Sequence, residues 1–300
     1  MSQIPIRFAV GCVPANLSRY PRNGRPLTTV TADESFVELL EYVEDELGFA
    51  ASHYNNSYLD RRVTARMRRT DRDSYETYLD HLQSDPDEAK NLLDSLSINV
   101  TGFFRNPDVW DGIRDVLRDL STEQRRLTIW SAACADGREP YSLSMLVHDE
   151  PSIDESAVRI VATDISEEAL DVARNGVYTE SRTADFDSEL EYLRDHEQYV
   201  EHDPETNTYR IDDAVKDLVS FERHDLISGR PKTGFHLVTC RNLFIYIDTE
   251  YKRSMLETIK ESLRRDGYLV IGKSETIPSS LKSTFTPVDN RSRIYQLTGA

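Results

Sequence analysis

Two acidic side chains in this sequence stand where a parallel sheet would place ligand-binding groups. Asp164 ends the apolar run "VRIVATD", and an acid at the end of a second strand can accept hydrogen bonds from both hydroxyls of a ribose. Asp225, in "HDLI", could accept a hydrogen bond from an adenine amino group. Upstream, the small residues of "SAACADG" (131–137) would let the backbone approach a ligand at the start of a helix. This combination indicates nucleoside binding.

Each of these features could also have a purely structural role, and the residues alone do not decide between that role and ligand binding. The small-residue segment contains one glycine, Gly137, so it is not a GxGxxG dinucleotide motif and could be a simple tight turn. Asp164 could cap the following helix, although Ser166 already suits that task. Asp225 could be an ordinary loop acid.

Polar side chains also follow a buried strand in "CRNLFIYID". Arg241 and Asn242 come directly after the apolar run "FHLVTC", at the strand end where α/β proteins bind ligands. Tyr246 then stands in an otherwise apolar stretch. A tyrosine in such a place is usually a core residue, but these neighbours favour a functional role.

The segment "INVTGFFRNPDVW" (98–110) mixes polar and aromatic residues in a way that suits neither a core element nor a surface loop. Asn99, Thr101 and Arg105 surround two phenylalanines. Asn106 and Pro107 have the types that begin a helix, with Asn106 as the capping residue.

These residues need a scaffold, and the pattern along the chain predicts an α/β fold. Apolar runs that read as strands alternate with helical patterns, which implies a parallel sheet with right-handed crossovers. The C-terminal "FTPVDNRSRIYQL" reads as an antiparallel hairpin. Strands are expected at 126–132, 158–164, 218–222, 235–240 and 268–272, and helices at 107–120, 139–149, 166–175 and 249–265.

Composition and hydrophobic pattern also divide the chain into several parts. Residues 1–30 contain arginines and prolines but no acid, so we interpret them as a disordered tail or a misassigned start. Residues 31–97 have four helical patterns and form an N-terminal helical domain. Residues 98–106 link it to the α/β domain, 107–300, which carries an inserted subdomain at about 178–215 with an acidic helix and a hairpin.

Several of these motifs together resemble the CheR-type chemotaxis receptor methyltransferases. The resemblance rests on "FFR", "WSAACADGREPYS", "ATDIS", "CRNLFIYID" and "GYLVIGKSE", and it covers about residues 34–297. It implies a class I, Rossmann-like methyltransferase sheet that uses S-adenosylmethionine to esterify glutamate side chains of chemotaxis receptors. The positions that match cofactor contacts in that family are Asn99, Thr101, Arg105, Glu139, Asp164, Asp225, Leu226, Arg241 and Asn242.

The resemblance also suggests catalytic residues and marks two departures. Tyr246 matches a tyrosine near the reacting methyl group, and we assign Arg105 and Tyr246 to the catalytic site. Arg138 stands where the family usually has an acid, and Asp225 stands where it often has Asn. The first departure would change the charge near the helix start, and the second would lose a hydrogen-bond donor.

Substrate docking is predicted on the second helical pattern, "LDRRVTARMRRTDR". Arg62, Arg66 and Arg69 are four and three residues apart, so they share one helix face. A glutamate-bearing receptor helix could dock there. The alternative is that these arginines pair with the protein's own carboxylates.

Composition narrows the remaining classes of function. A net charge of −17 opposes nucleic-acid binding. The scarcity of lysine (seven, against 53 Asp and Glu) suggests adaptation to high salt, and an ordinary acidic protein is the alternative. The spacing of His and Cys predicts no metal site. No apolar run is long enough for a membrane span, and a cytoplasmic protein is the default expectation. We also expect a monomer. A cofactor-sensing module without catalysis and a nucleotide-dependent oxidoreductase stay as alternatives.

Overall fold

The computed structural model describes residues 34–96, 101–180 and 185–298 of the chain. Asn99 and the proposed 1–30 tail therefore lie outside the described residues. Among the helices that the structure describes, none is long and apolar enough to cross a membrane.

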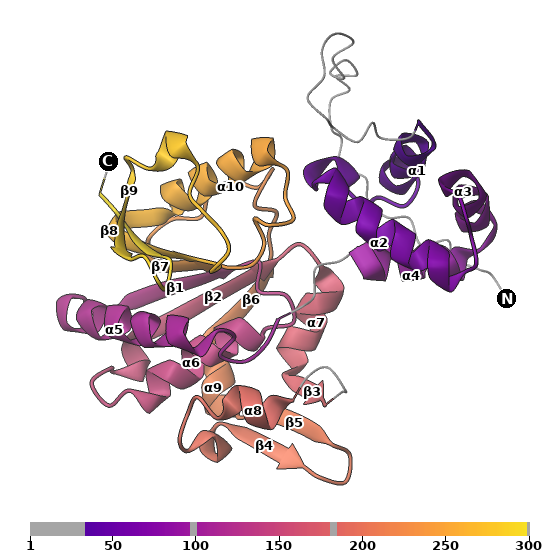
Figure 1. Cartoon of the computed structure of the whole chain (residues 1–300). Helices are drawn as coiled ribbons and strands as arrows, with labels where there is room; N and C mark the ends of the chain where they lie inside the picture. Colours follow the sequence, from indigo (N-terminus) through magenta and orange to yellow (C-terminus); the bar gives the residue numbers. More distant parts are fainter. Residues whose placement is uncertain (1–33, 97–100, 181–184, 299–300) are drawn as a thin grey trace, which may run out of the picture.

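The N-terminal part is a small bundle of helices (Figure 1). Three of its helix starts carry a side-chain cap, from Asn55, Ser74 and Asp85, as the residue types favour. Apolar residues at helical spacing, including Leu39, Leu59 and Leu92, meet in its core. The elements are α1 (Glu34–Asp45), η1 (Ala51–His53), α2 (Asn56–Arg69), α3 (Tyr75–Ser84) and α4 (Pro86–Leu96).

The second part is built on a seven-stranded sheet, and its topology is the one predicted. The strand order is β6-β2-β1-β7-β8-β10-β9, with five parallel strands followed by an antiparallel hairpin. The strands are β1 (Leu127–Ala132), β2 (Val158–Asp164), β6 (Val219–Arg223), β7 (Phe235–Cys240), β8 (Leu263–Ile271), β9 (Phe285–Asp289) and β10 (Ile294–Leu297). The chain runs outward from β1 in both directions, which creates a switch point between β1 and β7.

Helices cover both faces of this sheet, and alternate strand residues point to opposite layers. Ile129 of β1 packs in the layer with α5 and α6, while its neighbour Trp130 packs in the layer with α10. The helices are α5 (Pro107–Glu123), α6 (Arg138–Asp149), α7 (Glu167–Asn175), α9 (Asp213–Asp217) and α10 (Thr249–Ser262), with the short turns η2 (Glu155–Ala157) and η4 (Ser279–Leu281).

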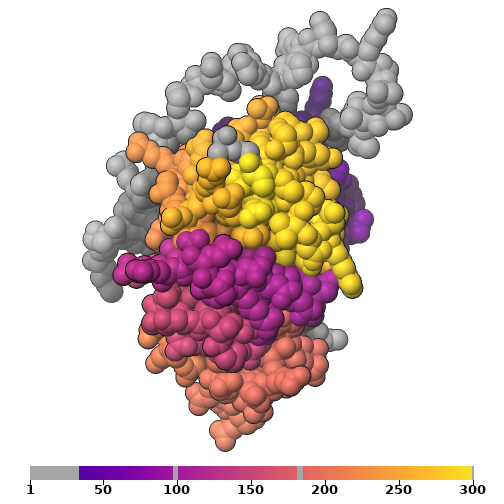
Figure 2. Space-filling model, turned by 90° about the vertical axis from the view of Figure 1, so that its left-hand side faces the viewer, coloured from indigo at the N-terminus to yellow at the C-terminus, as the bar shows by residue number. Residues whose placement is uncertain are grey.

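The inserted segment forms a separate three-stranded sheet of order β3-β5-β4. It lies below α6 and α9 in Figure 1, and Figure 2 shows it at the opposite end of the molecule from the C-terminal strands. Its aromatic residues Tyr178, Phe186 and Tyr209 join the core beneath α5 and α6. Its elements are β3 (Val177–Thr179), α8 (Phe186–Leu190), η3 (His196–Gln198), β4 (Val200–Asp203) and β5 (Thr208–Ile211).

Some sequence-based details were wrong. The acidic helix is only five residues long, and the strand at 177–179 was not predicted because three residues carry too little periodicity. β8 begins at Leu263, inside the predicted helix 249–265, because Leu263 already pairs with Phe235 of β7. Asn106 precedes α5 but makes no side-chain cap, since its backbone is left-handed with φ 61°.

Glu150 ties the end of α6 to α5. It is 6% exposed, and its Oε2 accepts from Nε of Arg118 at 2.7 Å and lies 3.5 Å from Nη1 of Arg114. The hydrogen bond from Arg118 lowers the pKa of Glu150 from 4.5 to about 2, although burial opposes the shift. A carboxyl with a depressed pKa stabilises the fold above its unfolded pKa and loses that contribution as the pH falls.

We therefore predict that Glu150→Gln lowers the free energy of unfolding by about 1.5–3 kcal/mol at pH 7. The difference from wild type should shrink as the pH falls from about 4.5 towards 2, because protonation removes the same charge from Glu150. Urea unfolding at several pH values measures both effects. Asp115→Asn, which alters an exposed partner of Arg118, is the control and should change stability by under about 1 kcal/mol. An equal loss at every pH would contradict the assignment.

Candidate functional site

Four of the predicted cofactor residues lie at or next to the carboxyl ends of β1, β2, β6 and β7, where open α/β sheets bind ligands: Glu139, Asp164, Asp225 and Arg241. Glu139 is at the centre. Its Oε1 accepts from the hydroxyls of Ser131 (2.8 Å) and Thr239 (2.7 Å), on the adjacent strands β1 and β7. Its Oε2 lies 3.4 Å from Nη1 of Arg241. One carboxylate thus joins both strands of the switch point to the first turn of α6.

Arg241 carries this network to the segment before α5. Its side chain is 2% exposed, its Nη2 donates to the carbonyl of Arg105 at 2.6 Å, and its guanidinium lies over the Trp110 ring at 5.5 Å. Burial lowers the pKa of Arg241, and the nearby positive charge of Arg105 adds to this effect while Glu139 opposes it. Asn106, which does not cap α5, instead offers its Oδ1 to Arg241 at 3.4 Å.

The segment that contains Arg105 is anchored by its aromatic residues. Phe103 and Phe104 are each 1% exposed, and the Phe104 amide donates to Ser142 of α6 at 3.0 Å. The indole of Trp110 donates to the same Arg105 carbonyl that Arg241 binds. Thr101 is half-buried at the start of the described segment. The two phenylalanines of this mixed segment are therefore core residues.

Asp164 holds the small-residue loop in place. Its Oδ2 accepts from the amide of Ala135 at 2.8 Å, and its Oδ1 accepts from the amide of Ser166 at 3.0 Å. Ser166 itself caps α7 through Ala169, so the cap belongs to the serine. Burial raises the pKa of Asp164. Ala133 and Ala135 both have positive φ (60° and 49°), a strained conformation that occurs often at functional sites.

Asp225 and Leu226 lie beside Asp164. The amide of His224 donates to the Asp164 carbonyl at 2.9 Å, and Leu226 is buried near Trp130. The Asp225 carboxylate accepts from Ser228 Oγ and, at 2.8 Å, from the amide of Ile227. Burial would raise the pKa of Asp225, but these hydrogen bonds hold it below its ordinary value.

Asn242 is placed by a residue that the sequence reasoning did not single out. Glu275 is 3% exposed, and its Oε2 accepts from the amides of Gly272 (2.5 Å) and Asn242 (3.1 Å). Its Oε1 lies 3.4 Å from the amide of Ile245. Glu275 thereby shapes the turn that leads to Tyr246. An acid just beyond a buried strand, as in "GKSE", was the available signal.

Tyr246 lies where the helical domain meets the sheet domain. Its ring is 4.8 Å from that of Tyr58 on α2, and its carbonyl accepts from the amide of Asn55 at 2.9 Å. Tyr54 bridges to Ile247 on the same segment. Burial raises the pKa of Tyr54, and nearby acidic groups, among them Asp164 and Asp225, raise it further.

The three docking arginines of α2 have different environments. Arg62 lies over the Tyr58 ring at 5.3 Å, and its buried Nε has no hydrogen-bond partner among the described residues. Arg66 forms a two-pronged ion pair with the buried Glu88, which itself accepts from Tyr78. Arg69 is exposed. The internal pairing that we considered as an alternative therefore holds for Arg66.

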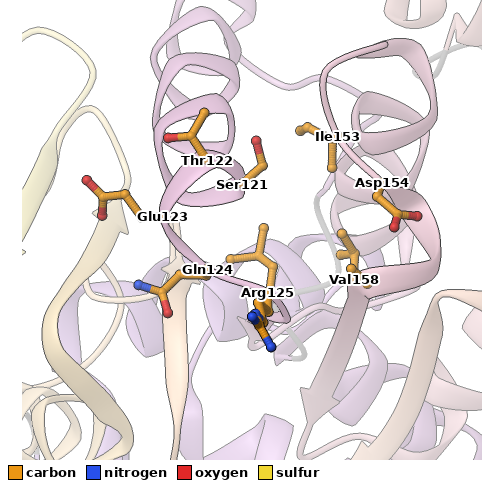
Figure 3. A pocket seen from close by; sticks show the side chains of 10 residues that line it. Ser121, Thr122, Glu123, Gln124, Arg125, Ile153, Asp154 and Val158 are labelled. Carbon is orange, nitrogen blue, oxygen red and sulfur yellow. The ribbon is translucent and has the colours of Figure 1, made fainter.

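A separate pocket lies at the opposite edge of the sheet. Figure 3 shows its lining side chains, which come from the end of α5 and from the segment before β2. Ser121, Gln124 and Arg125 are on one side, and Ile153 and Val158 are on the other. This pocket is at the amino ends of β1 and β2, so it is not the site that Glu139 and Asp164 form. No His, Cys, Asp or Glu group suited to a metal ion occurs within the described ranges.

The residues at the carboxyl edge fit S-adenosylmethionine. Glu139 and Asp164 provide carboxylates beside a helix start and a small-residue loop, which suits a cationic nucleoside. The buried Nε of Arg241 has no partner among the described residues, so the site retains an unused donor.

Comparison with known proteins identifies the family of the chain. Residues 99–294 match the CheR methyltransferase SAM-binding domain, and residues 34–97 match the CheR methyltransferase all-alpha domain. The chain belongs to the CheR methyltransferase family. A chemotaxis protein methyltransferase of Listeria monocytogenes is 32% identical over 82% of this chain and 91% of its own length. The chemotaxis protein methyltransferase of Borreliella burgdorferi is 27% identical over 83% of this chain and 89% of its own length. Chemotaxis protein methyltransferase 2 of Pseudomonas aeruginosa is 29% identical over 81% of this chain and 86% of its own length.

Membership of the family fixes the cofactor and the reaction class. The cofactor is S-adenosylmethionine, and the matches support methyl transfer in chemotaxis. The expected class I methyltransferase sheet with an N-terminal all-helical domain is confirmed.

We predict that Glu139→Gln weakens S-adenosylmethionine binding about tenfold or more, because it removes a buried negative charge and turns an amide towards Arg241. Calorimetric titration of the purified protein measures the dissociation constant. Glu123→Gln, at the exposed end of α5, is the matched control and should leave it unchanged. Equal affinities for both variants would exclude Glu139 from the cofactor site.

Proposed function

We propose that this protein transfers the methyl group of S-adenosylmethionine to glutamate side-chain carboxylates of chemotaxis receptors. The products would be glutamate methyl esters and S-adenosylhomocysteine, and the acceptors would lie on the cytoplasmic helical domains of the receptors. The proposed division of labour assigns acceptor capture to the helical domain, residues 31–97, and cofactor binding to residues 98–300.

The observation that carries this proposal is the position of Tyr246. It follows β7, at whose carboxyl end the buried Arg241 pairs with Glu139, and its ring packs on Tyr58 of the arginine-bearing helix α2. Arg62 also lies over this Tyr58 ring, at 5.3 Å. An acidic helix bound along α2 would therefore place a carboxylate next to the cofactor edge of the sheet.

Methyl transfer to a glutamate carboxylate requires no general acid or base from the protein. When bound, S-adenosylmethionine supplies a methyl group activated by its positively charged sulfur. A glutamate side chain has an ordinary pKa of about 4.3 and is ionised near neutrality, so no residue need remove a proton. The side chains have to align acceptor and donor, and such positioning can contribute roughly 7–11 kcal/mol in favourable cases.

Arg105 and Tyr246 are our candidates for this alignment. The carbonyl of Arg105 accepts from the buried Arg241, so Arg105 lies next to the charged network at the carboxyl end of β7. A guanidinium can hold a carboxylate by two parallel hydrogen bonds. The hydroxyl of Tyr246 would orient the acceptor or the donor. The buried pair of Phe103 and Phe104 keeps Arg105 in place without relying on the ligand.

We predict that Arg105→Ala reduces methyl transfer about 100-fold and that Tyr246→Phe reduces it about tenfold, because both lose groups that position the reactants. The assay is transfer of labelled methyl to receptor cytoplasmic fragments, with the product identified as a base-labile ester. Neither variant should lose its fold. Tyr42→Phe on α1 makes the same chemical change away from the site and should be silent. If Tyr246→Phe keeps full activity, the role of Tyr246 is wrong.

A second prediction concerns docking. Arg62→Glu combined with Arg69→Glu should raise KM for the receptor fragment at least about tenfold, since two attractive charges become repulsive. The dissociation constant of S-adenosylmethionine should stay the same. Arg66 is left intact, because a glutamate at this position would be buried with its carboxylate facing that of Glu88. Arg265→Glu, on the exposed start of β8, is the control. An unchanged KM would remove α2 as the docking helix.

A further inference from the structure

Three segments far apart in the sequence meet at one carboxylate, that of Glu189. Glu189 lies on α8 of the inserted subdomain, and its Oε2 accepts from the amide of Phe103 at 2.8 Å. The same oxygen lies 3.7 Å from Nη1 of Arg138, the first residue of α6. A β-carbon built on Gly102 would be only 3.0 Å from Glu189 Oε1, so the linker backbone lies directly against the carboxylate.

Aromatic packing closes this junction. Phe103 contacts Tyr178 and Phe186 of the inserted subdomain edge to face, with ring centroids 5.4 and 5.8 Å apart. The hydroxyl of Tyr178 donates to the carbonyl of Asp136, in the small-residue loop, at 2.7 Å. The inserted subdomain therefore contacts both the linker and the small-residue loop that leads into α6.

The charge at the junction is balanced by Arg138. This side chain is almost fully buried, donates from Nε and Nη2 to Asp136 at 3.1 and 3.0 Å, and lies over the Phe186 ring at 5.5 Å. An acid at position 138 would instead place a third carboxylate beside Asp136 and Glu189, and like charges at this distance repel. The arginine and the glutamate thus depend on each other.

We propose that Glu189 is a positioning residue that couples the inserted subdomain to the cofactor site. Two short routes lead from it to the site. Phe103 is two residues from Arg105, whose carbonyl Arg241 binds, and Arg138 is followed directly by Glu139. By holding Phe103 and Arg138, Glu189 fixes the linker against α6 before the ligand binds. The entropy lost in ordering these segments on binding is then smaller.

The coupling works in both directions, because linkage between two sites is reciprocal. If Glu189 helps to position the cofactor site, then bound cofactor stabilises the contacts of the inserted subdomain in return. Amide hydrogen exchange in β3, β4 and β5 should slow when S-adenosylmethionine is added to wild type. Binding to the native state also slows exchange at amides that open only by global unfolding, so the deciding observation is whether the protection of β3, β4 and β5 depends on Glu189.

The test compares Glu189→Ala and Glu189→Gln with wild type. For Glu189→Ala we expect a dissociation constant of S-adenosylmethionine about tenfold or more higher, the factor for one charge-assisted hydrogen bond. We also expect the ligand-dependent protection of β3, β4 and β5 to disappear. Glu189→Gln retains an acceptor for the Phe103 amide but loses the negative charge that faces Arg138. Its dissociation constant for S-adenosylmethionine should therefore lie between those of wild type and Glu189→Ala.

Controls separate this inference from other effects. Glu191→Ala removes an exposed acid next to α8 and should behave as wild type. If Glu189→Ala does not fold, Glu189→Gln and its exchange pattern still provide the test. Wild-type affinity and unchanged ligand-dependent protection in the folded variants would overturn the inference. The inference rests on the cofactor site of the proposed function but not on the acceptor, so a failure to methylate receptor fragments would leave it standing.

Discussion

Burial of the Arg241 guanidinium is the constraint on which the rest of the site depends. A charged group removed from water is costly unless it is paired and hydrogen-bonded. Its partners are Glu139 on α6, the Arg105 carbonyl on the linker and the face of Trp110 on α5. Satisfying one arginine therefore fixes the relative positions of β7, α6, the linker and α5.

The acids around Arg241 are held by the chain itself before any ligand binds. Glu139 is held by two hydroxyls, Asp164 by two amides and Glu275 by three. Each of these bonds restricts the orientation of a carboxylate, so less order has to be imposed when a cationic ligand binds. The cost is local strain, visible in the positive φ of Ala133, Ala135 and Asn242 at the same edge.

The site is also shared between domains. The segment 53–55 pairs with 245–248 through backbone hydrogen bonds from Asn55 to the Tyr246 carbonyl and from Asp248 to the His53 carbonyl. Asn55 has a second task, because its Oδ1 caps α2 while its Nδ2 donates to the Ile245 carbonyl. The helix that we propose for docking and the turn that carries Tyr246 are therefore positioned by the same residue.

Local chemistry determined much of this protein from the sequence alone. Periodicity and end signals located most of the strands and helices. Asp85, Ser166 and Gly176, for example, start or stop helices by interactions within a few residues. Because parallel strands end at one edge, Asp164, Asp225 and Arg241 could be brought together without a structure.

Only the tertiary structure decided which charges pair and which stay available. Arg62 and Arg66 look alike on a helix face, but a buried glutamate 22 residues further along the chain pairs with Arg66, while Arg62 lies over an aromatic ring. Asn106 looked like a cap and is a partner of Arg241 instead. Glu189 and Glu275 carried no periodic signal, because their roles arise from contacts with segments 86 and 33 residues away. Long-range contacts of this kind depend on how the layers pack, and that is not encoded in any local pattern.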